Sequence, residues 1–144
     1  MGAATMGKVI VTAKIENLED VFKVRQGVMT LDQVRSVEVT DALVDTGATG
    51  LMMPKRLIDQ LGIDQFRTRQ AKTVGGPVTM GVYRAVQLTI QGRDCIIDVF
   101  EVPDHIEVQI GQIPLEAMDW VVDPIGQRLI GNPAHGGEHM IDAY

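Results

Sequence analysis

Several ingredients on which other classes of protein depend are scarce in this chain. Its 144 residues include one cysteine, one Trp, two Tyr and three Phe, and no apolar run approaches the about 18 residues needed to cross a membrane. One cysteine cannot form a disulfide framework. The few aromatic residues leave Val, Ile, Leu, Met and Ala to build the core, so we expect one domain with no membrane span.

Clustered positive charge is also missing. The formal net charge is −6, and no basic cluster is longer than Lys55-Arg56. Phosphate neutralisation needs a basic stripe, so we expect no nucleic acid partner. The acidity favours solubility.

The first residues lack the apolar segment of a signal peptide. We therefore expect a cytoplasmic protein. Residues 1–7 precede the first predicted strand and are interpreted as a leader or a cloning remnant.

Metal-binding patterns are absent as well. His105, His135 and His139 stand outside any Glu-x-x-His or Cys-x-x-Cys context, and we predict no metal and no cofactor. Residues 132–144 are polar and glycine-rich, which predicts a flexible tail in which His135 is solvated. Cys95 lies in an apolar strand pattern and is interpreted as a buried small hydrophobe rather than a nucleophile.

Hydrophobic residues recur mainly with a period of two, which is typical of strands. We expect the first two strands to pair as a hairpin and the last two as another. The predicted strands cover residues 8–15, 20–25, 34–44, 65–74, 78–91, 93–102, 107–110, 120–122 and 127–130. The predicted helices cover 54–61, where a proline begins the helix and Gly62 ends it, and 114–118.

The most informative motif is Asp45-Thr46-Gly47-Ala48, which follows the apolar run 42–44. A carboxylate at the end of a buried strand, a short hydroxyl that can lock the loop and a glycine that allows a tight turn suit half of an aspartic protease site. Such a site needs two facing carboxylates that share one proton. Because the motif occurs once, it implies a symmetric dimer. The same tripeptide is also a good turn sequence after a strand.

Two glycine-containing segments accompany this motif. Gly75-Gly76-Pro77 lies between two predicted strands, so Val74, Gly75 and Gly76 stand at the tip of a hairpin that is a candidate flap over substrate. Ile110-Gly111 ends a short apolar strand before the second predicted helix. Each of these signals is weak by itself.

The order of these elements over residues 8–131 resembles the retropepsin-like, or retroviral-type, aspartic proteases, and most of all the bacterial-type gag-polyprotein-like aspartyl proteases. The resemblance implies an all-β fold: a closed β-barrel subunit with one or two short helices and a flap hairpin. It also implies a homodimer in which the two Asp45 loops meet, and a peptide or protein substrate.

The chain departs from viral members at the second helix. These usually have Gly-Arg-Asn or Gly-Arg-Asp there, whereas this chain has Gly111-Gln112-Ile113. The missing arginine predicts a different dimer contact and weaker association without ligand. Gln109 replaces a residue that is commonly apolar, and we interpret it as pointing to solvent.

We interpret the chain as an aspartic endopeptidase. One alternative is a catalytically weak peptide-binding or scaffold module with the same fold. Another is a β-barrel that binds a small ligand and uses Asp45 only as a turn residue.

Overall fold

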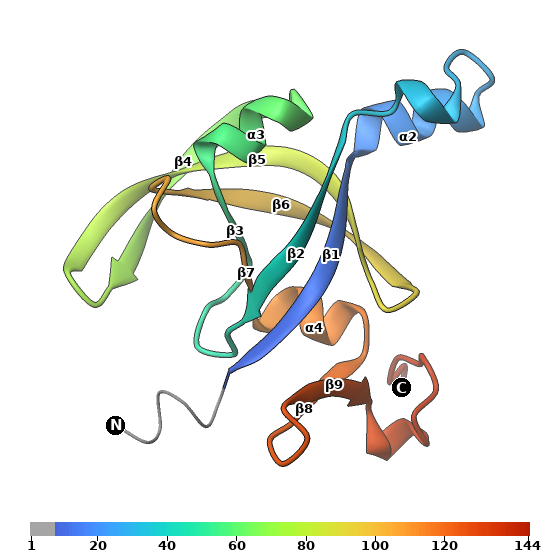
Figure 1. Cartoon of the computed structure of the whole chain (residues 1–144), viewed down its shortest axis with the longest axis vertical. Coiled ribbons are helices and arrows are strands. Elements are labelled where there is room, and N and C mark those ends of the chain that lie inside the picture. The colour runs from blue at the N-terminus through green and yellow to red at the C-terminus, as the bar shows by residue number, and fades with distance from the viewer. Residues whose placement is uncertain (1–7) are drawn as a thin grey trace.

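The computed structural model describes residues 8–144, and strands make up most of its regular secondary structure (Figure 1). The predicted leader at residues 1–7 lies outside the described residues. The strands are β1 (Val9–Asn17), β2 (Ser36–Val44), β3 (Leu51–Pro54), β4 (Asp64–Thr73), β5 (Gly76–Ile90), β6 (Arg93–Val102), β7 (Gln109–Ile110), β8 (Trp120–Asp123) and β9 (Arg128–Gly131). The helices are α2 (Leu18–Arg25), α3 (Lys55–Leu61) and α4 (Gln112–Ala117), with 3-10 turns η1 (Leu31–Gln33) and η2 (Pro133–His135).

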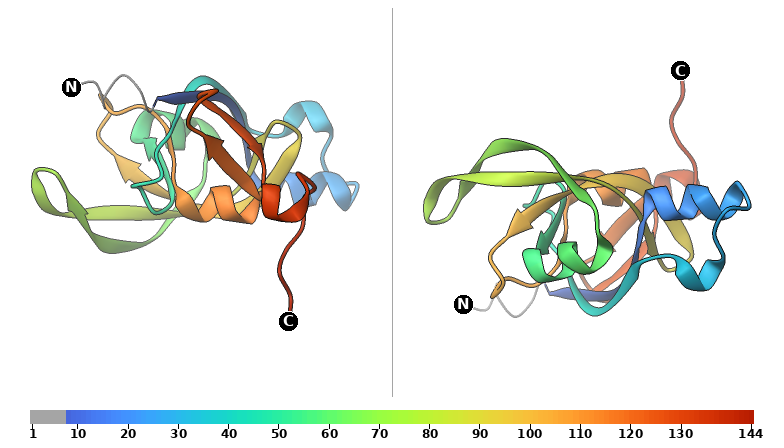
Figure 2. Two further views of the ribbon diagram at one scale, coloured as in Figure 1. Left: turned by 90° about the horizontal axis from the view of Figure 1, so that it is seen from below. Right: turned by 90° about the horizontal axis from the view of Figure 1, so that it is seen from above.

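The main sheet closes into a barrel. Its strand order is β1-β2-β7-β3-β6-β5-β4, and β1 also pairs with β5. That pairing joins the ends of a six-strand ring and leaves β4 outside it. The β4–β5 hairpin projects from one end of the barrel and α2 from the other (Figure 2). The all-β barrel expected from the sequence is confirmed.

The core fills the barrel because residues of each strand alternate between its two faces. Val9, Val11, Ala13 and Ile15 of β1 are buried, while the residues between them are exposed or half-buried. Buried residues of β2, β3, β5, β6 and β7 complete one apolar cluster. This packing makes the barrel a rigid support for the loops at its end.

Helix α3 forms where the sequence predicts it. Pro54 is its N-cap residue, and Gly62 ends the helix with φ = 65°. A left-handed conformation suits glycine, which has no Cβ to clash with the preceding turn. Ile58 and Leu61 are buried and hold the helix on the barrel.

The strand predicted over 20–25 is wrong, and so is the hairpin that it was expected to form with the first strand. These residues belong to α2, and β1 pairs with β2 and β5 instead. The side chain of Asn17 accepts a hydrogen bond from the backbone N–H of Asp20 and so caps the helix. The buried carboxylate of Asp20 then accepts three hydrogen bonds from Arg35, at 2.8 to 3.0 Å. These polar contacts favour a helix over the strand that the apolar alternation suggested.

The second helix and the last hairpin follow the prediction with small shifts. α4 begins at Gln112, two residues before the expected start, and β8 pairs antiparallel with β9. The strand predicted over 107–110 shortens to Gln109–Ile110. Among residues 8–144, no helix is both long and apolar enough to span a membrane.

Candidate active site

Strand β7 brings the Asp45 loop, residues 45–50, beside the segment Ile110–Gly111. β7 runs parallel to β2 and antiparallel to β3, so it lies between the two strands that the loop connects. The backbone N–H of Asp45 donates to the carbonyl oxygen of Ile110 at 2.9 Å. Two segments far apart in the sequence are thus joined at the backbone of Asp45.

The start of α4 holds the loop in place. The backbone N–H groups of Gly111, Gln112 and Ile113 donate to the carbonyl oxygens of Gly50, Ala48 and Thr49, each at 2.9 Å. The first N–H groups of a helix have no partner within the helix, so the loop satisfies them. Backbone groups therefore fix the path of the loop.

Gly111 is required by this close approach. A Cβ at this position would lie 2.6 Å from the carbonyl oxygens of both Ala48 and Gly50. Backbone oxygens cannot move away without breaking the hydrogen bonds that hold the loop. The Ile110-Gly111 signal is weak in the sequence, and packing against the Asp45 loop explains why its second residue is glycine.

The Asp45 carboxylate is half-buried and sparsely bonded. Its Oδ1 accepts the backbone N–H of Gly47 at 2.9 Å, and the N–H of Ala48 donates to the Asp45 carbonyl oxygen at 3.0 Å. No further partner of the carboxylate occurs among residues 8–144. The second oxygen is therefore available to water or to a second carboxylate.

Thr46 and Gly47 form the exposed apex of the loop. The sequence predicted that the Thr46 hydroxyl would lock the loop, but it makes no hydrogen bond to any described residue of the chain. The lock is provided instead by the backbone contacts with α4. The hydroxyl stays available to a partner outside the chain.

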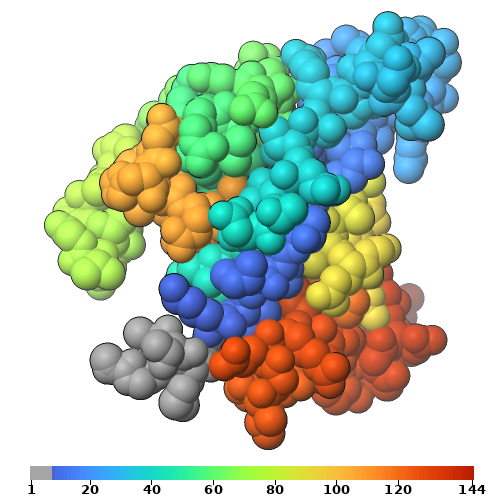
Figure 3. All heavy atoms as spheres, in the orientation of Figure 1, coloured from blue at the N-terminus to red at the C-terminus, as the bar shows by residue number. Residues whose placement is uncertain are grey.

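The predicted flap is the hairpin formed by β4 and β5. Its tip contains Val74 and Gly75, both exposed, and Gly76 has φ = 110°. The hydroxyl of Thr73 donates to the Gly76 carbonyl oxygen at 2.7 Å and closes the turn. The positive φ that the glycines were expected to supply is confined to Gly76. Figure 3 shows the hairpin protruding at the edge of the molecule.

A row of paired residues links the Asp45 loop to the flap. Cross-strand partners share a face of a sheet, and one set of pairings runs without interruption across β2, β7, β3, β6, β5 and β4. We call this set the floor row: Leu43, Gln109, Met52, Phe100, Val82 and Arg67.

No member of the floor row belongs to the main apolar cluster, although Val82 is buried. The residues next to its members on the opposite face belong to that core: Val44, Ile110, Leu51, Val99 and Tyr83. Leu43, Gln109, Met52 and Phe100 are half-buried. Gln109 is thus on the non-core face, in agreement with its predicted orientation. Sequence reasoning missed Met52 and Phe100, because only the long-range strand register reveals them.

The Asp45 loop does not line either of two surface hollows of the described chain. One hollow, of about 330 Å³, is lined by polar residues that include Glu38, Arg56 and Asp104. The other, of about 240 Å³, lies between α2 and the start of β4. Asp45 is half-buried, and the apex of its loop is exposed.

Other reactive groups do not converge on Asp45. Among residues 8–144, no group of three or more His, Cys, Asp and Glu side chains is arranged to hold a metal ion. Cys95 is half-buried in β6, and burial raises the pKa of its thiol to about 11. A thiol with that pKa stays protonated and is a poor nucleophile.

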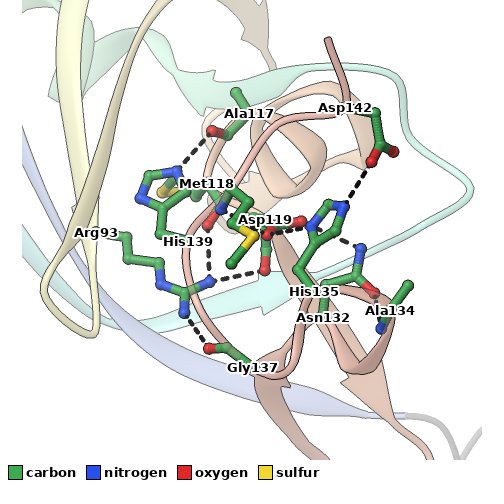
Figure 4. A network of polar contacts seen from close by, with 11 residues as sticks. Arg93, Ala117, Met118, Asp119, Asn132, Ala134, His135, Gly137, His139 and Asp142 are labelled. Carbon is green, nitrogen blue, oxygen red and sulfur yellow. Dashed lines mark hydrogen bonds and ion pairs between the residues drawn. The ribbon is translucent and has the colours of Figure 1, made fainter. Parts of the chain in front are cut away.

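A second polar site surrounds Asp119 at the other end of α4 (Figure 4). The Asp119 cluster consists of Asp119, Asn132, His135, Met140 and Asp142. Both ring nitrogens of His135 face carboxylates, Nδ1 at 2.7 Å from Asp119 and Nε2 at 2.9 Å from Asp142. Asp119 also accepts hydrogen bonds from the Asn132 side chain and the Met140 backbone N–H.

These contacts correct the expectation that His135 is solvated, since its side chain is only 12% exposed. The hydrogen bond from His135 is the main cause that lowers the pKa of Asp119 to about 2. The same bond, followed by that to Asp142, raises the pKa of His135. The Asp119 cluster ties residues 132–142 to the body of the protein.

Comparisons with known proteins agree with the geometry of the Asp45 loop. Residues 29–128 match the model of a family described as aspartyl protease. A search of curated proteins finds no match. The matched region contains the Asp45 loop, the flap hairpin and the Ile110–Gly111 segment. Because it covers more than half of the chain, the chain belongs to the retropepsin-like aspartyl proteases.

Proposed function

We propose that this protein is a homodimeric aspartic endopeptidase whose active site forms where two Asp45 loops meet. The observation that carries the proposal is the state of the Asp45 carboxylate, which is held by one backbone N–H of its own loop and is otherwise unpaired in the described chain. The family performs its chemistry with a pair of carboxylates, and the chain contains one Asp-Thr-Gly. A second copy supplies the missing half.

In the proposed mechanism, a water molecule lies between the two carboxylates, one ionised and one protonated. The ionised Asp45 accepts a proton from the water as its oxygen attacks the peptide carbonyl carbon. The protonated Asp45 donates its proton to the carbonyl oxygen. Collapse of the tetrahedral species breaks the C–N bond, and the leaving nitrogen takes up a proton from the dyad. No covalent enzyme intermediate forms.

The exposure of the loop apex supports the proposal of a dimer. Thr46 and Gly47 are exposed, and the apolar side chain of Ile113, at the start of α4, is 53% exposed beside the loop. An apolar side chain and an unused hydroxyl at one site suit contact with a second copy. Gln112 replaces the charged residue of viral members, so we expect association to be weak without ligand.

The flap suits an extended peptide. β4 is the edge strand of its sheet, and its residues are almost all exposed. A substrate that lies between the flap and the Asp45 loops would pair with backbone groups near Gly75 and Gly76 as an added strand.

The test compares Asp45→Asn with Asp41→Asn, which removes an exposed carboxylate of β2 four residues earlier. We expect Asp45→Asn to lower turnover of an unstructured peptide by about 10²- to 10⁴-fold or more, while circular dichroism and sedimentation stay unchanged. Asp41→Asn should retain activity. A peptide analogue with a hydroxyl at the position of the lytic water should inhibit the wild type. Retained turnover in Asp45→Asn would exclude the mechanism, and peptide binding without cleavage by the wild type would favour the binding module.

A further inference from the structure

Positive charge is concentrated in the flap. The chain has 19 acidic residues, yet none lies between Gln65 and Arg93. The same stretch contains five of the 13 basic residues of the chain: Arg67, Arg69, Lys72, Arg84 and Arg93. A protein with a net charge of −6 therefore carries a cationic segment over its proposed site.

Two of these five residues have structural roles. Arg84 forms an ion pair with Asp98 at 2.9 Å. Arg93 stacks over Trp120 and donates to the backbone carbonyl oxygens of Asp119 and Gly137. Their charges support the fold and are not free for a ligand.

The three basic residues of β4 have no counter-charge. Among residues 8–144, no carboxylate lies within 4 Å of the charged groups of Arg67, Arg69 or Lys72, and all three side chains are exposed. Arg67 stacks over the ring of Phe66, with its guanidinium carbon 4.4 Å from the ring centroid. Stacking restrains the guanidinium while its N–H groups stay free to bind an acceptor.

The strand register separates these residues by face. Arg67 is paired with Val82 and Arg69 with Met80, so both arginines share the face of the floor row. Lys72 is opposite Pro77, three positions along β4 from Arg69, and an odd separation places it on the other face. The side-chain hydrogen bond between Gln70 and Thr79 marks that other face independently.

On the basis of the proposed function, we propose that Arg67 and Arg69 are specificity-determining residues that select peptides with a glutamate or aspartate side chain flanking the scissile bond. A guanidinium binds a carboxylate by two parallel hydrogen bonds, and these two project along the face that leads to Asp45. A peptide that extends from the Asp45 loops along β4 places its flanking side chains beside them. A peptide with neutral side chains at these flanking positions lacks this contact.

The experiment measures kcat/KM on a set of unstructured peptides. The parent peptide has Gln at each position flanking the scissile bond, and each member replaces one Gln with Glu. We expect the wild type to prefer Glu at one or more positions by about fivefold, the effect of one exposed charge pair of about 1 kcal/mol. The preference should weaken as salt is raised. Arg67→Gln/Arg69→Gln should lose it while cleaving the parent peptide at the wild-type rate.

Lys72→Gln is the matched control, because it removes the same charge from the same strand on the opposite face. It should keep the preference for Glu. If Lys72→Gln lost the preference for Glu equally, the assignment of selectivity to one face of β4 would be overturned. The preference would then arise from the total positive charge of the flap. Arg69→Glu should reverse the preference toward Lys at the same peptide position.

Two results separate this inference from the proposed function. If the wild type cleaves the Gln and Glu peptides equally, the selectivity is refuted while the protease assignment stands. If no peptide is cleaved and none responds to Asp45→Asn, the proposed function itself fails. A preference for phosphoserine peptides with none for Glu over Gln would contradict carboxylate selection and assign phosphate to the same arginines.

Discussion

Two aspartates lie near opposite ends of α4, and their carboxylates have different surroundings. Asp45 belongs to the loop that accepts the first N–H groups of the helix, and Asp119 follows the last turn. The Asp119 carboxylate is buried and bonded to His135, Asn132 and Met140. The Asp45 carboxylate is half-buried and accepts one N–H, from Gly47.

This difference indicates which of the two carboxylates can accept a proton from water. A carboxylate whose acceptor sites are filled cannot take a proton from water without losing those bonds, so Asp119 stabilises structure. Asp45 keeps an oxygen available because its side chain makes one bond in the loop, to the Gly47 N–H, and backbone contacts with β7 and α4 provide the other support. The rigidity that the proposed catalysis needs thus comes from α4 and Gly111.

The substitution expected to have the largest effect on the Asp45 loop is Gly111→Ala. The added Cβ meets two backbone carbonyl oxygens at 2.6 Å, so the Asp45 loop must shift. We expect a loss of about 1–3 kcal/mol in the free energy of unfolding and a much larger fractional loss of turnover, measured by denaturant titration and peptide cleavage. Gly75→Ala is the control for the loss of stability, since its Cβ meets nothing closer than 3.8 Å. Wild-type turnover in Gly111→Ala would contradict the support given to the loop.

In the proposed mechanism, the flap hairpin closes over the substrate and takes no part in proton transfer. Gly76→Val places a β-branched residue at φ = 110°, where side chains are strained, so turnover should fall severalfold. Two carboxylates that share one proton predict a bell-shaped pH–rate profile with an acidic optimum. Both limbs should stay in place in Gly76→Val, because the glycine takes no part in proton transfer. A displaced basic limb, or a flat wild-type profile, would count against these roles.

A substitution at the opposite end of α4 should change the stability of the protein and leave peptide cleavage unchanged. Asp119 has φ = 58°, and Asn tolerates that conformation, so Asp119→Asn removes the charge with little backbone strain. We expect a lower melting temperature and faster hydrogen exchange in residues 132–142, with the pH–rate profile unchanged. Unaltered exchange in that segment would show that the Asp119 cluster does not hold it.

The smallest expected effect is the pH dependence of that cluster. The pKa of His135 is raised above its ordinary 6.5, so its contribution to stability is complete below 6.5 and is lost as pH rises through the raised value. The pKa of Asp119 is lowered from 3.8 to about 2, so its contribution is present above 3.8 and is lost as pH falls toward 2. The destabilisation caused by His135→Gln should therefore be greater at pH 5.5 than at pH 9 in thermal melts. Equal destabilisation at both pH values would refute the ionic role of His135.

Local signals explain why much of the fold was predictable. Pro54 and Gly62 bound α3 in the sequence as they do in the structure, and the alternation in β1 identifies its buried face. α2 was missed because Val21, Phe22 and Val24 suggest a strand. The better signal was Asn17 followed by Glu19 and Asp20, a capping residue with acidic residues in the first turn.

The candidate site was predictable only where its residues are contiguous. Asp45-Thr46-Gly47-Ala48 is one short motif, whereas β7 reaches its position between β2 and β3 through pairings about sixty residues apart in sequence. The floor row depends on the same long-range pairings, and the contact of His135 with Asp119 joins residues 16 positions apart. No local pattern in the sequence encodes them.

The most direct test of the central claim, that each active site needs Asp45 from two chains, is a subunit-mixing titration. Wild-type protein is mixed with increasing fractions of Asp45→Asn at constant total concentration, allowed to exchange, and assayed for peptide cleavage. If every site requires two carboxylates, activity falls as the square of the wild-type fraction, and specific activity also falls on dilution as dimers dissociate. A linear decrease with the wild-type fraction, or constant specific activity in a demonstrated monomer, would contradict the account.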